Sequence, residues 1–303
     1  MAKGLVIKST GSWYTVLEGD RTIPCKIKGK FRLEDIKCTN PVTVGDIVHF
    51  NMEDDKLGVI YEIEPRKNYI LRKATRFHKE AHMIAANIDQ AVLMVSLKKP
   101  KTPFEFIDRY LLMAESFFID TKIILNKCDL VSDEEVSYFK SIYEGAGYDC
   151  FDISVKQELN LDKVKPLFTN KISLISGNSG VGKSTFINYL NPNLNLSTNS
   201  VSEYHKSGKH TTTFSEIFKL NNDSYIIDTP GIKSFGLLDI KPEEAGLYFK
   251  EIFHASKECK FNNCMHLEEP GCAVKAAVEA GKIHEMRYRS YINIVLDDNE
   301  KYR

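Results

Sequence analysis

The chain has 303 residues, a formal net charge of zero, 43% hydrophobic residues and 27% charged residues. This composition is ordinary for a soluble globular protein with two or three domains, and it excludes a global basic field that would attract nucleic acid. No apolar run approaches the roughly 18 residues of a membrane span, and the first residues turn polar too soon for a signal peptide. Seven cysteines, three of them clustered late in the chain, argue against a secreted disulfide framework. We therefore expect a cytoplasmic protein without a membrane partner.

Residues 1–66 form a first region that is rich in β-forming residues. Turn residues such as Glu18-Gly19-Asp20 and Glu53-Asp54-Asp55 separate its short runs. The expected strands lie at 4–8, 13–17, 23–27, 46–50 and 58–63. Five short strands within about sixty residues are typical of a small all-β barrel such as an OB-fold.

The same region offers a possible RNA-binding surface. Lysine and arginine outnumber the acidic residues in 1–32, and Trp13, Tyr14 and Phe31 could stack on bases. The alternative is that the aromatic side chains form the barrel core and the lysines are solvated. The following segment, residues 66–82, is strongly basic. It predicts a connector that either touches a phosphate backbone or is a solvated linker.

The middle region, residues 67–238, alternates between strand and helix patterns. Apolar runs predict strands at 89–95, 122–125, 150–153, 172–175 and 225–227, and helical periodicity predicts helices at 104–118, 134–143 and 184–190. This alternation indicates an α/β domain with a parallel sheet covered on both faces. The last region, residues 239–303, is predicted to be mostly helical. We expect three domains with these boundaries.

A phosphate-binding loop lies between the strand at 172–175 and the helix at 184–190. Gly177 to Ser184 follow the pattern G-x-x-x-x-G-K-[ST], in which backbone N–H groups converge on an anion. Lys183 would reach the β- and γ-phosphates, and the Ser184 hydroxyl would hold Mg²⁺. The residues predicted to bind phosphate are Gly177, Asn178, Ser179, Gly180, Val181, Gly182, Lys183, Ser184 and Thr185.

Asn126-Lys127-Cys128-Asp129 follows a buried strand directly and has the form N-K-x-D. The Asp129 carboxylate can accept two hydrogen bonds from guanine, whereas adenine lacks that donor pair. Asn126 would brace the loop, and the stem of Lys127 would lie along the base. Ser154-Val155-Lys156 resembles the guanine-contacting S-A-K loop of GTPases, so Ser154 and Lys156 join the candidate site. An ATP-dependent enzyme is disfavoured by Asp129.

Asp228-Thr229-Pro230-Gly231 ends the strand at 225–227 and has the form D-x-x-G. Asp228 would hold Mg²⁺, and the Gly231 N–H would sense the γ-phosphate. Upstream, Thr211, Thr212 and Thr213 lie where a switch threonine belongs, and Thr212 is our first choice as the Mg²⁺ ligand. The alternative for the threonine run is the start of a strand.

These motifs occur in a circularly permuted order, with N-K-x-D first, then S-x-K, the phosphate loop, the threonines and D-x-x-G. The order need not disturb the site, because each loop still leaves the carboxyl end of its strand. With this order the whole chain resembles the small-subunit-dependent GTPases of bacteria, the RsgA family. The resemblance implies an OB-fold, a permuted GTPase domain and a zinc domain. It also implies slow GTP hydrolysis stimulated by the small ribosomal subunit, in late subunit maturation.

The residue after D-x-x-G is Ile232, which cannot orient water as the glutamine of Ras-like GTPases does. Another group must do so, from this chain or from a partner. His210, beside the switch threonines, is the candidate, and the resemblance implies the same role. The alternative is a loop histidine that contacts phosphate or RNA.

Three cysteines and one histidine cluster in the last region, within fourteen residues. The predicted ligands are Cys259, Cys264, His266 and Cys272, a closed Cys₃His set typical of one structural Zn²⁺ ion. The alternative is free buried cysteines, which is our interpretation of Cys25, Cys38, Cys128 and Cys150.

Together these motifs predict a GTPase that uses GTP/GDP, Mg²⁺ and Zn²⁺, and we expect it to be a monomer. The resemblance implies that it binds the small ribosomal subunit and its rRNA. GTP would order the switch loops, that state would bind rRNA, and hydrolysis would release it. The alternative function is an RNA-binding chaperone or scaffold in which nucleotide is only a structural ligand.

Overall fold

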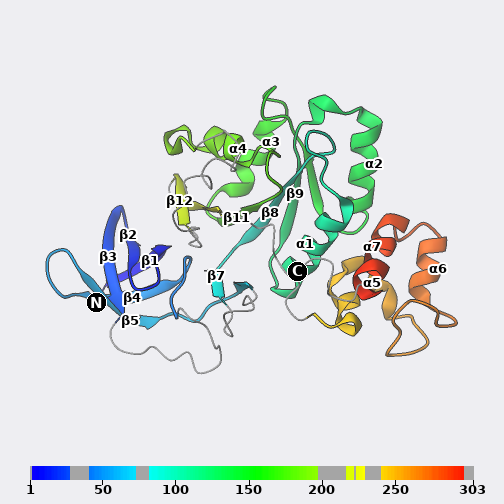
Figure 1. Ribbon diagram of the computed structural model, residues 1–303, viewed down its shortest axis with the longest axis horizontal. Coiled ribbons are helices and arrows are strands. Elements are labelled where there is room, and N and C mark those ends of the chain that lie inside the picture. Colours follow the sequence, from blue (N-terminus) through cyan, green and yellow to red (C-terminus); the bar gives the residue numbers. More distant parts are fainter. Residues whose placement is uncertain are drawn as a thin grey trace, which may run out of the picture. The chain divides into compact units, whose positions relative to one another are not determined.

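The computed structural model describes residues 2–27, 41–72, 82–196, 216–221, 223–228 and 240–296 (Figure 1). The chain forms two compact units. The first unit comprises residues 1–91, 165–176 and 184–234, and the second comprises residues 92–164, 177–183 and 235–303.

The N-terminal part of the first unit is a closed barrel, as predicted. Its strands are β1 (Ala2–Ser9), β2 (Tyr14–Glu18), β3 (Arg21–Ile27), β4 (Ile47–Met52) and β5 (Gly58–Ile63). β1 pairs with both β2 and β4, β2 pairs with β3, and β5 joins β3 in parallel and β4 in antiparallel. This closure leaves no strand of the barrel with an open edge, which is the OB-like arrangement.

One face of each barrel strand supplies the core, because successive side chains of a strand point to opposite sides. The buried core residues are Val6, Tyr14, Val16, Cys25, Val42, Val48, Phe50 and Ile60. Tyr14 is 2% exposed and Trp13 is 53% exposed. Of the three aromatic residues considered for stacking, Tyr14 is therefore a core residue and Trp13 lies at the surface. Phe31 lies outside the described residues.

The segment predicted as a basic connector, residues 66–82, includes β6 (Tyr69–Arg72) and leads into β7 (His82–Ala86), two strands that the sequence analysis did not predict. β6 pairs in antiparallel with β7. Ile70 and Met83 are 1% and 2% exposed, so each short strand buries an apolar side chain. The surrounding lysines and arginines hid this pattern in the sequence. Residues 73–81 lie outside the described residues.

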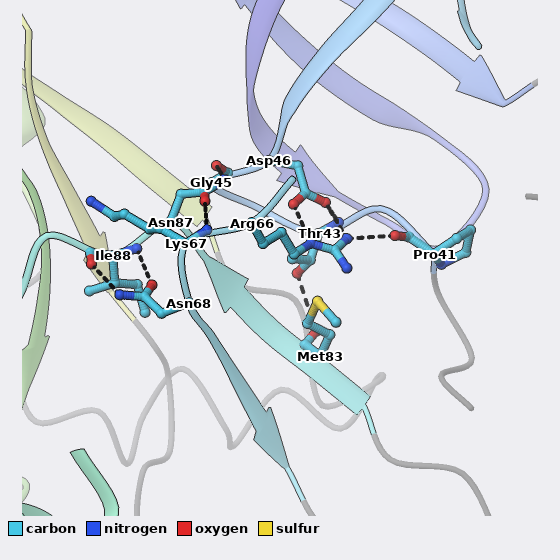
Figure 2. A network of polar contacts seen from close by, with 10 residues as sticks. All are labelled: Pro41, Thr43, Gly45, Asp46, Arg66, Lys67, Asn68, Met83, Asn87 and Ile88. Atoms are coloured by element: carbon cyan, nitrogen blue, oxygen red, sulfur yellow. Dashed lines mark hydrogen bonds and ion pairs between the residues drawn. The ribbon is translucent and has the colours of Figure 1, made fainter. Parts of the chain in front are cut away.

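The loop before β4 is hydrogen-bonded to the segment that carries β7 (Figure 2). Thr43 Oγ1 donates to the Met83 carbonyl at 3.2 Å, and the amide of Asn87 donates to the Gly45 carbonyl at 2.9 Å. A Cβ on Gly45 would clash with the Ala86 carbonyl, so only glycine allows this close approach. The barrel is thus joined to residues 82–88 by hydrogen bonds from side chains to main-chain carbonyls.

The remaining strands of the first unit are β11 (Ile172–Ser176), β12 (Glu216–Asn221) and β13 (Ser224–Asp228). β11 and β13 are parallel, and β12 pairs with β13 in antiparallel. β12 was not predicted, because its sequence Glu-Ile-Phe-Lys-Leu-Asn mixes polar and apolar residues and only Ile217 is buried among its side chains. The helix α4 (Lys183–Leu190) follows β11, as predicted, and the short η3 (Pro192–Leu194) follows it.

The second unit holds the strands β8 (Gln90–Val95), β9 (Thr121–Leu125) and β10 (Asp149–Asp152), in the order β10-β9-β8. All six residues of β8 are buried, as expected for a strand covered on both faces. The helices α1 (Phe104–Ser116), α2 (Asp133–Glu144) and α3 (Leu161–Val164) connect the strands, with η1 (Cys128–Leu130) before α2 and η2 (Lys165–Phe168) after α3. α2 begins with a capping box between Ser132 and Glu135.

The C-terminal part of the second unit is helical, as predicted (Figure 1). It comprises η5 (Pro242–Tyr248), α5 (Lys250–Ser256), α6 (Ala273–Glu279) and α7 (Glu285–Leu296). Its core joins Phe249, Ile252 and Tyr291 with Leu112 of α1. Among the helices of the described residues, none has the length and apolar character to cross a bilayer.

Candidate functional site

The phosphate loop follows β11 and depends on glycines at its two ends. Gly177 has φ +147° and Gly182 has φ +105°, values that L side chains rarely adopt. A Cβ on Gly177 would clash with the Met94 carbonyl, and a Cβ on Gly182 would clash with the Asn126 amide. The loop is therefore packed against β8 and the N-K-x-D loop so closely that only hydrogen fits at these two positions.

Lys183 and the start of α4 place positive charge at the phosphate loop. The Lys183 ammonium donates to the carbonyls of Gly177 and Asn178 at 2.6 and 2.9 Å. α4 begins at Lys183, so the partial positive charge of the helix terminus adds to the lysine charge. Ser184 is partly buried in the first turn of α4, and Thr185 beside it is exposed. This arrangement places two sources of positive charge where a phosphate chain would bind.

Asn126 connects three of the predicted loops. It follows β9 and is 3% exposed. Its amide donates to the Val181 carbonyl at 2.7 Å, and its Oδ1 accepts from the Val155 N–H at 3.1 Å. One buried side chain thereby joins the N-K-x-D loop to the phosphate loop and to the S-x-K loop. The predicted bracing role of Asn126 fits this geometry.

Lys127 and Asp129 lie beside Asn126 in different environments. Lys127 has φ +65° and donates from Nζ to the Gly180 carbonyl at 2.7 Å and to the Lys99 carbonyl. Asp129 lies in η1 and its carboxylate is exposed. An exposed carboxylate next to a lysine stem that lies against the phosphate loop is suited to receive the guanine edge.

Ser154 and Lys156 belong to the loop that follows β10. Ser154 is completely buried, and its Oγ accepts from the Gln157 N–H at 3.2 Å. Lys156 is exposed. Ser154 therefore shapes the loop from inside, whereas Lys156 is available at its surface.

The D-x-x-G motif is only partly described. Asp228 ends β13 and pairs with Ile175 of β11, so its strand ends next to the strand that leads into the phosphate loop. Gly231, Thr212 and the candidate catalytic His210 lie outside the described residues, as do Thr211, Thr213 and Ile232. Their assignments stay predictions.

The Cys₃His cluster forms in the C-terminal part of the second unit. The ligand atoms of Cys259, Cys264, His266 and Cys272 all lie within 4.8 Å of one another. His266 Nδ1 is 3.6 Å from Cys259 Sγ and 3.5 Å from Cys272 Sγ, and these two sulfurs are 4.0 Å apart. Tetrahedral Zn²⁺ with ordinary bond lengths requires S···N and S···S distances of about 3.5 and 3.8 Å, so the four residues can hold such an ion.

Side chains that the sequence analysis did not identify fix this metal-binding loop. Glu269 accepts the N–H groups of Met265 and Leu267 at 2.6 and 2.9 Å. From α7, Tyr288 donates to the His266 carbonyl at 2.6 Å and Tyr291 donates to the Met265 carbonyl at 2.8 Å. Burial lowers the pKa of His266, which favours the neutral imidazole that binds metal. The two tyrosines lie 16 and 19 residues after Cys272, so the local sequence around the cysteines did not identify them.

The remaining cysteines lie apart from the cluster. Cys25 and Cys150 are buried and Cys128 is partly buried. Burial raises the pKa of the thiols to about 11 at Cys25 and about 12 at Cys150, as expected for small core residues. Cys38 lies outside the described residues.

Two family models match the chain. The one described as RsgA GTPase matches residues 63–238, and the RsgA N-terminal domain matches residues 3–60. Among curated proteins, the small ribosomal subunit biogenesis GTPase RsgA of Phocaeicola vulgatus is 50% identical over 99% of both chains. The protein of the same name from Christiangramia forsetii is 48% identical over 99% of this chain and 98% of its own.

Two solved structures are similar over nearly the whole length. YjeQ from Thermotoga maritima is 35% identical with a TM-score of 0.79, covering 97% of both chains. YloQ, described as a circularly permuted GTPase, is 32% identical with a TM-score of 0.75, covering 97% of this chain and 94% of its own. These similarities confirm the multi-domain fold and the permuted motif order predicted from the sequence.

Proposed function

This chain belongs to the RsgA GTPase family, and from that premise we propose that it hydrolyses GTP on the small ribosomal subunit during late maturation of the subunit. The observation that carries the proposal is the junction at Asn126. Its side chain is hydrogen-bonded to Val181 in the phosphate loop and to Val155 in the S-x-K loop. One residue therefore links the loop proposed to bind phosphate with the loop proposed to bind the base. Relatives whose sequences align with this chain over nearly its whole length are named as small ribosomal subunit biogenesis GTPases.

In this proposal the ligands are GTP and GDP with Mg²⁺. Asp129 selects guanine, and the backbone of residues 177–182 with Lys183 holds the phosphates. Ser184, Thr212 and Asp228 would hold Mg²⁺, which would supply positive charge for the phosphates. Gly231 senses the γ-phosphate, and His210 orients the attacking water in place of Ile232. The Lys183 ammonium beside the phosphate loop and the exposed Asp129 support these roles.

The domain assignment extends the same proposal. Residues 1–66 form an RNA-binding barrel, residues 67–238 the GTPase domain and residues 239–303 a domain stabilised by one Zn²⁺ ion. The exposed Trp13 supports an rRNA contact by the barrel, and the interatomic distances at the Cys₃His cluster support zinc. We propose a cytoplasmic monomer whose GTP-bound state binds rRNA and whose hydrolysis releases it.

The test is phosphate release by the full chain, measured with and without purified small subunits, with GTP and with ATP. We expect slow release from GTP alone, strong stimulation by small subunits, and no activity with ATP. Large subunits at the same concentration are the matched control.

The possible outcomes distinguish the proposal from its alternative. Tight binding of rRNA with no GTP hydrolysis, stimulated or not, would identify an RNA-binding scaffold with nucleotide as a structural ligand. Equal stimulation by large and small subunits would contradict the proposed partner.

A further inference from the structure

A short loop after β8, residues 96–102, lies against the phosphate loop and was not identified from the sequence. The carbonyl of Lys99, near the middle of this loop, accepts a hydrogen bond from the Lys127 ammonium. The same ammonium donates to Gly180 in the phosphate loop at 2.7 Å. The Lys127 ammonium therefore joins the 96–102 loop to the phosphate loop. The two loops also lie close together elsewhere, since a methyl group placed on Gly180 would lie 3.5 Å from Pro100 Cδ, an ordinary van der Waals distance.

Two buried side chains close this 96–102 loop at its base. The Ser96 N–H donates to Thr102 Oγ1 at 3.1 Å, and the Thr102 N–H donates to the Ser96 carbonyl at 2.8 Å. Ser96 Oγ in turn donates to the Lys98 carbonyl at 2.6 Å. Both Ser96 and Thr102 are 1% exposed, so water cannot replace these bonds when one partner is removed.

The closure fixes where the Lys99 carbonyl lies. With Ser96 and Thr102 bonded, the five residues between them have little freedom, and the Lys99 carbonyl is held at the Lys127 ammonium. Lys127 is in turn held in the left-handed region at φ +65°, directly after Asn126. The orientation of the lysine stem, along which the base would lie, thus depends on a hydroxyl that touches no part of the nucleotide site.

We infer that Ser96 and Thr102 are positioning residues for guanine-nucleotide binding, which act by holding the Lys99 carbonyl against the Lys127 ammonium. This inference rests on the proposed function, because it assumes that guanine nucleotide binds between Lys127 and the phosphate loop. Removing the Thr102 hydroxyl frees the 96–102 loop and loosens Lys127. Nucleotide then dissociates faster, while the chemistry at the γ-phosphate is untouched.

The experiment measures dissociation of a fluorescent GDP analogue from full-length Thr102→Val by stopped flow. Valine keeps the shape of threonine but leaves the buried Ser96 N–H without its acceptor, and we expect dissociation about tenfold faster than in the wild type. The separate variant Thr102→Ser keeps the hydroxyl, so its dissociation rate should stay near the wild-type value. Lys101→Ala, an exposed side chain of the same loop, is the matched control and should leave the rate unchanged.

A double-mutant cycle separates positioning from a general loss of stability. If Thr102 acts through Lys127, then Thr102→Val should add little to the dissociation rate in a Lys127→Met background. Full additivity of the two substitutions would overturn the inference, as would a wild-type rate for Thr102→Val. If the wild type itself bound no GDP, the proposed function would fail, and that result is visible before any variant is compared.

Discussion

Arg66 binds Asp46 through two parallel hydrogen bonds, from Nε to Oδ1 at 2.6 Å and from Nη2 to Oδ2 at 2.7 Å (Figure 2). The Asp46 side chain is fully buried and that of Arg66 is 8% exposed. Arg66 also donates to the Pro41 carbonyl at 2.7 Å, and the Thr43 N–H donates to Asp46 Oδ2 at 2.8 Å. The pair therefore fixes the loop before β4 against the segment that leaves the barrel.

Replacing Arg66 with methionine should destabilise the first unit. The substitution leaves the Asp46 carboxylate buried without its cation, which costs about 3 to 5 kcal/mol of unfolding free energy. Urea unfolding followed by circular dichroism measures this loss. The double variant Asp46→Asn/Arg66→Met should recover part of the stability, since the asparagine oxygen can still accept the Thr43 N–H without a charge.

The exposed pair of Lys219 with Asp20, 2.7 Å apart, is the control for this prediction. Asp20→Asn should give an unfolding curve that overlays the wild type, because solvent screens a pair at the surface. An Arg66→Met curve that also overlays the wild type would show that the buried pair contributes no net stability.

Gly182→Ala should weaken guanine-nucleotide binding by about tenfold or more. The alanine would have to keep a backbone φ of +105°, which L residues rarely adopt, and its Cβ would clash with the Asn126 amide. The phosphate loop must therefore shift away from Asn126, which weakens binding. Isothermal titration with GDP measures the change. Gly19→Ala has a positive φ in open space and serves as the control, which should bind GDP as the wild type does. Unchanged affinity in Gly182→Ala would contradict the close packing at the N-K-x-D loop.

Removing metal should unfold the C-terminal part of the second unit while the barrel stays folded. Three thiols and one imidazole would hold their loop together through a bound ion, and a structural zinc site contributes directly to folding. After chelation, hydrogen exchange should accelerate in residues 259–272 and in α7, whose tyrosines donate to this loop. Exchange in β1 to β5 should not change.

Elemental analysis checks the same site independently. The wild type should contain one zinc ion per chain, and Cys272→Ser should contain much less. Cys150→Ala removes a buried thiol elsewhere and should keep the full zinc content. Equal zinc loss in both variants would mean that the Cys₃His cluster is not the binding site.

Arg287→Met should destabilise the contact between α7 and α1. The Arg287 guanidinium is 1% exposed and binds Asp108 at 2.6 Å and Glu251 at 2.7 Å. Its loss leaves these two buried carboxylates without their cation, at a cost of about 3 to 5 kcal/mol. Burial already raises the pKa of Asp108, so the arginine is the main group that favours its charged form. Thermal unfolding measures the effect.

The neighbouring Arg289 provides the matched control for this substitution. It lies on the same helix, its side chain is 67% exposed, and it pairs with Glu285 at 3.8 Å. Arg289→Met should unfold at the wild-type temperature. If both variants unfolded at the same lowered temperature, the effect would belong to helix α7 in general and not to the buried pair.

His210→Ala should abolish stimulated hydrolysis while GTP affinity stays near that of the wild type. A water-orienting group acts on the transition state and contributes little to ground-state binding. Phosphate release with small subunits and equilibrium titration with a GTP analogue measure the two quantities separately. His205→Ala, in the same stretch of sequence, is the control and should retain stimulation. Stimulated turnover that survives in His210→Ala would exclude the catalytic role.

The sequence by itself determined the elements whose structure depends on residues close together along the chain. The phosphate loop was predictable because Gly177 and Gly182 stand at fixed spacing between an apolar strand and a helix. Buried strands such as β8 and β9 were predictable because they are continuous apolar runs. The metal cluster was predictable because three cysteines and one histidine lie within fourteen residues, a spacing typical of structural zinc sites.

Only the tertiary structure decided the contacts between residues that are far apart in the chain. Nothing in the local sequence pairs Arg287 with Asp108, 179 residues away, or selects Arg66 as the partner of Asp46. β12 was missed because its pairing with β13, and not its own pattern, makes it a strand. The same holds for the 96–102 loop, whose Lys99 carbonyl has a role only because folding brings Lys127 and Gly180 to it. A sequence records which groups can bond, and the packed fold decides which of them meet.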